Sequence, residues 1–101
     1  MSFEKILNTA GNTLKKRGKQ YGKARPLHEN IAKRFTLVLE KKLAPGQSVT
    51  AYEVARLLNE LKAARQDQAE FHEDSILDQI CYLVIAYQLA GEETGIFGND
   101  E

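Results

Sequence analysis

Apolar residues recur at helical spacing in four segments of this chain, and the strict alternation typical of strands is nearly absent. The first segment shows the pattern plainly, with apolar side chains at i, i+3, i+4, i+7 and i+11: Phe3, Ile6, Leu7, Ala10 and Leu14. Because helices with one apolar stripe bury it against one another, 101 residues of this kind predict a single all-α domain, a four-helix bundle.

Capping and helix-breaking residues predict where these segments begin and end. Thr50 followed by Glu53 forms a capping box, and Gly91 stands at a natural C-cap position. The stretch 17–26 contains two glycines and a proline, which indicates a basic loop. We therefore expect helices over residues 3–16, 26–43, 50–65 and from 71–74 to 91, within one domain of residues 1–90 followed by an acidic, flexible tail of residues 91–101.

The fourth segment is apolar on most sides from Ile76 to Leu89. A helix of this composition is either central in its own bundle or shared with a partner subunit. A domain this small buries only a modest core, and self-association adds buried surface. We therefore expect a homo-oligomer, either a dimer or a larger assembly.

Composition limits the environment of the chain. Its single cysteine, Cys81, excludes an internal disulfide framework and lies in an apolar run, so we interpret it as a buried packing residue. No apolar stretch approaches the roughly 20 residues of a membrane span, and the first residues lack the apolar core of a signal peptide. These features predict a cytoplasmic protein without a membrane partner.

Charge is segregated along the chain although the net charge is zero. Residues 1–50 carry 11 Lys and Arg against 3 Asp and Glu, whereas residues 51–101 carry 3 against 11. Either the two halves attract each other, within or between chains, or a basic surface for an anion lies beside an acidic site for a metal. Nucleic acid is a poor partner, because the acidic half repels phosphates and no recognition-helix pattern is present.

Four charged residues lie on stripes that otherwise face the core. Lys62 and Arg65 continue the apolar stripe of the third segment, and Asp74 and Asp78 precede that of the fourth. The short turn at 66–71 makes these two helices antiparallel, which brings the four groups together. Desolvated charges must be paired or bound, so the four form either a structural ion-pair cluster or the lining of a pocket for a phosphate, a metal or both.

The histidines and the basic loop supply further candidates. His72 is either a cap or surface residue at a helix start or an anion ligand, and we expect His28 at the surface. In the loop, Arg17 offers bidentate phosphate geometry and Tyr21 a face for stacking. The alternative for this loop is a solvated basic turn.

Two blocks of these residues resemble a family of short phage and prophage proteins related to the MazG-like, all-α nucleotide pyrophosphohydrolases. One block is Arg17-Gly18-x-x-Tyr21-Gly22, followed by His28 and Ile31-Ala32. The other is Leu61-Lys62-x-x-Arg65, followed by His72-x-Asp74-Ser75-x-x-Asp78-x-x-x-Tyr82. The resemblance covers residues 14–88 and implies a small helical bundle that pairs through its central helices, in the host cytoplasm if the chain is phage-encoded.

For the larger superfamily, the resemblance implies magnesium-dependent hydrolysis of nucleoside triphosphates, with the ions held by an E-x-x-E pair and an E-x-x-D pair on successive helices. Here Lys62-x-x-Arg65 stands in place of the first pair and Ser75-x-x-Asp78 in place of the second. Lys and Arg repel magnesium ions and instead neutralise phosphates directly. The resemblance therefore supports the fold and a nucleotide-like ligand more than it supports hydrolysis, and it assigns no catalytic residue.

The leading hypothesis is a protein that binds a nucleotide or a nucleotide-derived signal, and thereby sequesters a host defence signal or adjusts nucleotide pools. The residues that would bind phosphate are Arg17, Lys62, Arg65 and His72. Tyr21 and Tyr82 would stack on or border the base, and Asp74 and Asp78 would orient the basic groups or bind a metal. The enzymatic alternative is a Mg²⁺-dependent pyrophosphohydrolase with Glu70, Glu73, Asp74 and Asp78 as metal ligands. A third alternative is a non-enzymatic module for self-association or for binding a host protein.

Overall fold

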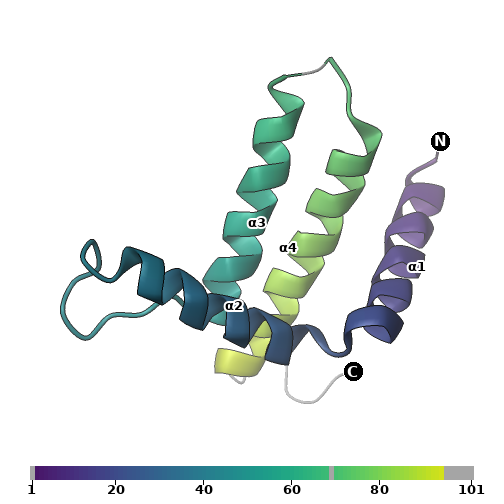
Figure 1. The fold of residues 1–101 in the computed structure, drawn as a ribbon. Coiled ribbons are helices and arrows are strands. Elements are labelled where there is room, and N and C mark those ends of the chain that lie inside the picture. Colours follow the sequence, from purple (N-terminus) through teal and green to yellow (C-terminus); the bar gives the residue numbers. More distant parts are fainter. Residues whose placement is uncertain (1, 69, 95–101) are drawn as a thin grey trace.

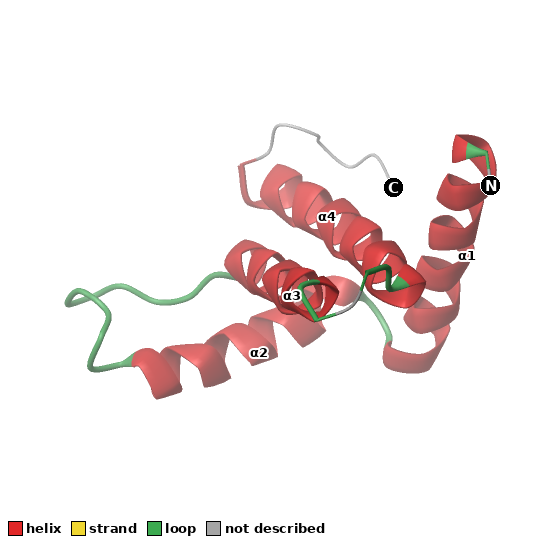
Figure 2. Cartoon of the chain, turned by 90° about the horizontal axis from the view of Figure 1, so that it is seen from above, coloured by secondary structure: helices red, strands yellow, loops and turns green. Residues whose placement is uncertain are grey.

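The structure is a computed structural model that describes residues 2–68 and 70–94. In these residues the backbone forms helices and no strands: α1 Phe3–Tyr21, α2 Ala24–Leu39, α3 Ala51–Gln66 and α4 Glu73–Thr94. α3 and α4 form an antiparallel hairpin, α1 lies on the opposite side of α4 from α3, and α2 crosses the end of the hairpin where α3 begins (Figures 1 and 2). The prediction of an all-α chain with four helices is therefore confirmed for the described residues.

Small side chains fill the interface between α3 and α4. The buried cluster and the half-buried residues packed against it are Ala51, Ala55, Ala86 and Leu89, with Tyr52 and Ile85. Small residues at such a contact let the two helix axes approach closely. Cys81 is fully buried, as predicted, and its Sγ–H donates to the carbonyl of Ala10 on α1 at 3.6 Å.

α1 extends further than the sequence pattern indicates, so the predicted loop at 17–26 is wrong over most of its length. The helix continues through Gly11 and Gly18 and ends at Gly22, whose φ of 78° is a left-handed conformation that favours glycine. Mid-helix glycines cost about 1 kcal/mol each relative to alanine, an amount that tertiary packing offsets. Arg17 and Tyr21 therefore lie on the last turns of a helix.

The connection between α2 and α3 is fixed by side-chain hydrogen bonds. α2 starts two residues earlier and ends four residues earlier than predicted. Oγ1 of Thr36 on α2 accepts from the N–H of Val49 at 2.9 Å, which holds the returning chain against α2. The capping box at the start of α3 is confirmed: Thr50 Oγ1 accepts from the Glu53 N–H at 3.1 Å, and the Glu53 carboxylate accepts from the Thr50 N–H at 3.0 Å.

α4 continues through Gly91 to Thr94, so the predicted helix end at Gly91 is wrong. A glycine terminates a helix when it adopts the left-handed conformation, and among the described residues only Gly22 and Gly46 do so. The predicted tail beyond residue 94 lies outside the described residues. In the described part of the chain, no helix combines the length and hydropathy of a membrane span.

Candidate functional site

One carboxylate joins three helices. Asp78 of α4 accepts from Arg17 Nη2 of α1 through Oδ1 at 2.6 Å, and its Oδ2 lies 3.0 Å from Lys62 Nζ of α3. α4 lies between α1 and α3 (Figure 2), so the side chain of Asp78 can reach both neighbouring helices. We call Arg17, Lys62 and Asp78 the three-helix cluster. The side chains of Lys62 and Asp78 are 15% exposed and that of Arg17 is 40% exposed, so two members of the cluster are largely sheltered from solvent and Arg17 is the most accessible.

Hydrogen bonding decides the charge state of the three-helix cluster. Burial raises the pKa of Asp78, but the hydrogen bonds from Arg17 and Lys62 outweigh burial, and the pKa lies below its ordinary value of 3.8. The hydrogen bond to Asp78 likewise raises the pKa of Arg17, against the opposing effect of burial. The carboxylate is therefore ionised at neutral pH, and two cations face one anion.

Tyr82 lies beside this cluster. It follows Asp78 by one turn of α4 and is half-buried. Its hydroxyl is the last of several groups that raise the pKa of the Arg17 guanidinium, after the hydrogen bond from that group to Asp78. Tyr82 is therefore close to Arg17, the cation that α1 contributes to the cluster.

Arg65 and Asp74 do not join the cluster, so the expected group of four charges forms only in part. Both side chains are exposed, and neither takes part in an ion pair within the described residues. Only the Lys62–Asp78 pair of the expected group is present. Both lie at helix ends next to the turn of the hairpin, since Arg65 is in the last turn of α3 and Asp74 is in the first turn of α4.

His72 caps the start of α4, which was one of the two roles expected for it, the other being an anion ligand. Its Nδ1 accepts from the backbone N–H of Ser75 at 3.2 Å and lies 2.7 Å from Ser75 Oγ. Ser75 is fully buried, so the cap is sheltered from solvent on that side. Tyr21 is exposed at the end of α1, one turn beyond Arg17.

The expectation that His28 lies at the surface is wrong. The residue is 3% exposed, and its Nδ1–H donates to the carbonyl of Ala24 at 2.8 Å. Its Nε2 is buried and has no hydrogen-bond partner among the described residues. His28 and Ala32 are the buried residues of α2, and their spacing of four places both on the helix side that faces the hairpin.

The carboxylates of the enzymatic alternative do not come together. Glu70, Glu73 and Asp74 are exposed, and Asp78 is paired with two cations. Within residues 2–68 and 70–94, no group of three or more His, Cys, Asp or Glu side chains is placed to hold a metal ion. A magnesium centre built on several carboxylates has no support in this donor set.

Two polar features of α3 were not among the sequence candidates. Gln66 Nε2 donates to Gln79 Oε1 across the hairpin. Asn59 buries its Oδ1 without a hydrogen-bond partner among the described residues. Asn59, Lys62 and Gln66 follow one another at i, i+3 and i+7, and this spacing is the signal that indicates a common polar side of α3.

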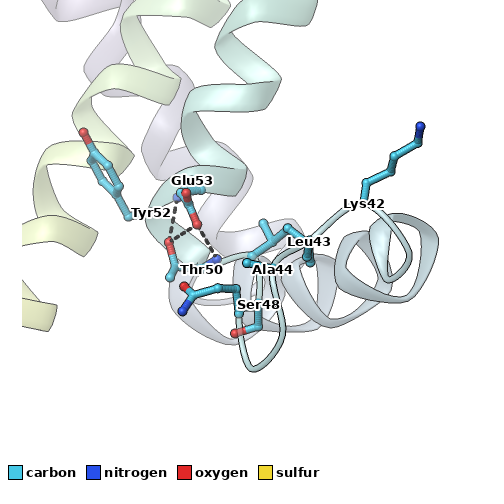
Figure 3. A pocket seen from close by; sticks show the side chains of 9 residues that line it. Lys42, Leu43, Ala44, Ser48, Thr50, Tyr52 and Glu53 are labelled. Carbon is cyan, nitrogen blue, oxygen red and sulfur yellow. Dashed lines mark hydrogen bonds between the residues drawn. The ribbon is translucent and has the colours of Figure 1, made fainter.

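A separate open pocket lies at the connection between α2 and α3 (Figure 3). Its lining consists of Lys42, Leu43, Ala44, Gln47, Ser48, Val49, Thr50, Tyr52 and Glu53. Figure 3 shows that the hydroxyl of Thr50 and the carboxylate of Glu53 are bound to each other and to the backbone in the helix cap. None of the predicted site residues belongs to this pocket.

A family model described as a domain of unknown function (DUF6378) matches residues 5–90. The match includes all of α2 and α3, nearly all of α1 and most of α4, and therefore every residue of the three-helix cluster. No curated protein and no solved structure matches the chain.

Proposed function

We propose that this chain, which belongs to the family of the domain of unknown function DUF6378, binds the phosphate groups of a nucleotide or nucleotide-derived signal at the three-helix cluster. The observation that carries the proposal is the convergence of Arg17 and Lys62 on Asp78 at a partly open junction of three helices. In this proposal the protein is a MazG-like protein of phage type. Its binding sequesters a host defence signal or adjusts a nucleotide pool.

Both cations keep donors for a ligand. A guanidinium carries five N–H donors and an ammonium three. The described contacts with Asp78 engage one nitrogen of Arg17 and the single nitrogen of Lys62, and each group has further N–H bonds. Two cations against one carboxylate leave an excess positive charge, which a phosphate neutralises without a metal ion. In this arrangement Asp78 orients both clamps.

The other proposed contacts surround the cluster. Tyr82 borders the base, and Tyr21 supplies a second aromatic face one turn beyond Arg17. Arg65 is exposed one turn beyond Lys62 and adds a second phosphate contact. His72 contributes less than its sequence position indicates, because its Nδ1 is engaged in the cap of α4.

Calorimetric titration with nucleoside mono-, di- and triphosphates and cyclic nucleotides, each with Mg²⁺ and with EDTA, tests this function. We expect binding that persists in EDTA and weakens roughly tenfold or more in Lys62→Ala and in Arg17→Ala, because each variant removes a charge-assisted phosphate contact. Lys33→Ala removes an exposed cation of α2 and is the matched control, with unchanged affinity. Absence of binding heat with every nucleotide contradicts the proposal. Pyrophosphate release that Asp78→Asn abolishes favours the enzymatic alternative instead.

Self-association is a second role, and exposed apolar side chains favour it. Large apolar residues of α2, α3 and α4 are exposed, including Leu37, Val38, Leu61, Leu83 and Tyr87. Leu83 and Tyr87 are one helical turn apart on α4, and exposed apolar side chains that lie side by side mark interaction surfaces more often than scattered ones. We infer that the chain forms a dimer or a larger assembly, and light scattering across a range of protein concentrations measures it. A monomer at every concentration contradicts this role.

A further inference from the structure

The charges of the three-helix cluster leave one net positive charge. Arg17 and Lys62 each carry a positive charge. Asp78 is ionised at neutral pH, since burial raises its pKa less than the hydrogen bonds from both cations lower it. The side chains of Lys62 and Asp78 are each 15% exposed. Charges that are sheltered from water in this way need opposite charges in contact with them, so a bound anion is favoured when it cancels the excess and adds no more.

The surroundings of the cluster change this charge balance little. Side chains three and four residues apart share one face of a helix. At these distances from the cluster residues on α1, α3 and α4, the charged residues are Arg65 and Asp74, and the remaining positions are uncharged. Arg65 and Asp74 have opposite signs and exposed side chains, so water and salt screen them. A bound anion therefore meets a net charge close to that of the cluster alone.

A phosphate bound by both cations lies next to a carboxylate. The oxygens of Asp78 are 2.6 Å from Nη2 of Arg17 and 3.0 Å from Nζ of Lys62, so this anion already contacts both groups. A phosphate that accepts from their other N–H bonds shares the two cations with Asp78. Its first negative charge cancels the excess positive charge of the cluster, whereas a second negative charge is repelled by the carboxylate.

We infer that the ligand of this site is a phosphodiester rather than a phosphate monoester. A phosphodiester, as in a cyclic nucleotide or in the linkage of a dinucleotide, carries one negative charge. A terminal phosphate monoester carries nearly two at neutral pH, because its second pKa is about 6. The inference rests on the nucleotide binding proposed above and names the class of nucleotide that the cluster selects.

Calorimetric titration with AMP and with cyclic AMP tests this selection, because the two ligands differ in the second ester bond of the phosphate. Matched pairs with guanine, cytosine and uracil cover the other bases. We expect the wild type to bind the cyclic member of a pair roughly tenfold or more tightly at about pH 7.5. At about pH 5 the monoester takes up a proton and becomes singly charged, so its affinity rises toward that of the cyclic ligand. Asp78 stays ionised across this range, because its pKa lies below its ordinary value of 3.8.

Asp78→Asn separates the effect of charge from that of ligand shape. The substitution keeps the size of the side chain but leaves two positive charges at the site, which match the two negative charges of a monoester. We expect the preference to shift roughly tenfold or more toward AMP at neutral pH. Asp74→Asn removes an exposed carboxylate that has no ion pair within the described residues, and this matched control keeps the preference of the wild type. Circular dichroism verifies folding, and the pH series on the wild type tests the inference without any variant.

Three results overturn the inference and leave nucleotide binding in place. The first is a wild type that binds the monoesters as tightly as the cyclic ligands at neutral pH. The second is a preference that a folded Asp78→Asn variant retains and that acidification does not reduce. The third is binding of a nucleoside triphosphate without binding of either member of any pair. If no nucleotide of any kind binds, the proposed function fails together with this inference.

Discussion

Among single residues, replacing Asp78 affects the charges of the three-helix cluster differently from replacing Arg17 or Lys62. Removing Arg17 or Lys62 leaves the carboxylate with one cation, whereas removing the carboxylate leaves two cations side by side in a half-buried place. An uncompensated charge that is sheltered from water costs more than a lost surface pair. The same two cations can bind a phosphate, because its negative charge can be shared between them.

Replacing Asp78 with asparagine is expected to lower the free energy of unfolding by about 2 kcal/mol at neutral pH, because two charge-assisted contacts are lost and two cations face each other. The folded pKa of Asp78 lies below its ordinary value, so this contribution is complete above the pKa of the unfolded chain, about 3.9. As the pH falls through the folded pKa, the contribution is lost. Urea unfolding of both proteins at several pH values therefore gives a difference that shrinks on acidification.

The matched control for this measurement is Asp74→Asn, because Asp74 is exposed and has no ion pair within the described residues. We expect its free energy of unfolding to stay within about 0.5 kcal/mol of the wild type. Equal losses from both substitutions, or a loss in Asp78→Asn that does not depend on pH, contradict the role given to the three-helix cluster.

At the scale of helices, a feature was predictable where neighbouring residues or the packing of a hairpin determine it, and not where it depends on backbone conformation or on a third helix. The start of α3 follows from Thr50 and Glu53 because a capping box is complete within four residues. The end of α1 did not follow, because the sequence contains Gly18 and Gly22, and only the backbone conformation shows that Gly22 ends the helix. The Lys62–Asp78 pair was predictable from antiparallel packing, whereas the contribution of Arg17 required the position of α1 against α4.

The attachment of α1 to the hairpin rests on few contacts, which makes it the element most sensitive to a single change. Ala10 is its buried residue, and Arg17 supplies its described ion pair with α4. Arg17→Ala is expected to raise hydrogen exchange of the α1 amides roughly tenfold, since one charge-assisted bond contributes about 1.5 kcal/mol to its docking. Exchange in α3 and α4 remains slow. Lys19→Ala, an exposed cation on the same helix, is the control, and equal acceleration in both variants contradicts this role of Arg17.

At the scale of the whole molecule, a single chain has a larger radius of gyration than a compact domain of its length. The radius of gyration is 14.9 Å, whereas about 13 Å is typical of a compact domain of 100 residues. The buried cluster between α3 and α4 is mostly alanine, which contributes little apolar area per residue. Larger apolar side chains such as Leu37, Val38 and Leu61 remain exposed. The self-association proposed above would bury part of this exposed apolar area.

If association completes the core, thermal stability must depend on protein concentration. For a dimer that dissociates as it unfolds, a tenfold rise in concentration adds about 1.4 kcal/mol to the free energy of unfolding. We therefore expect the melting temperature, followed by circular dichroism, to rise by about 3–5 °C for each tenfold increase in concentration. Val38→Asp is expected to lower the melting temperature at high concentration and to remove its concentration dependence, because folding of the single chain does not use this exposed side chain. If the melting temperature of the wild type stays constant over a hundredfold range of protein concentration, association does not contribute to its stability and this prediction is wrong.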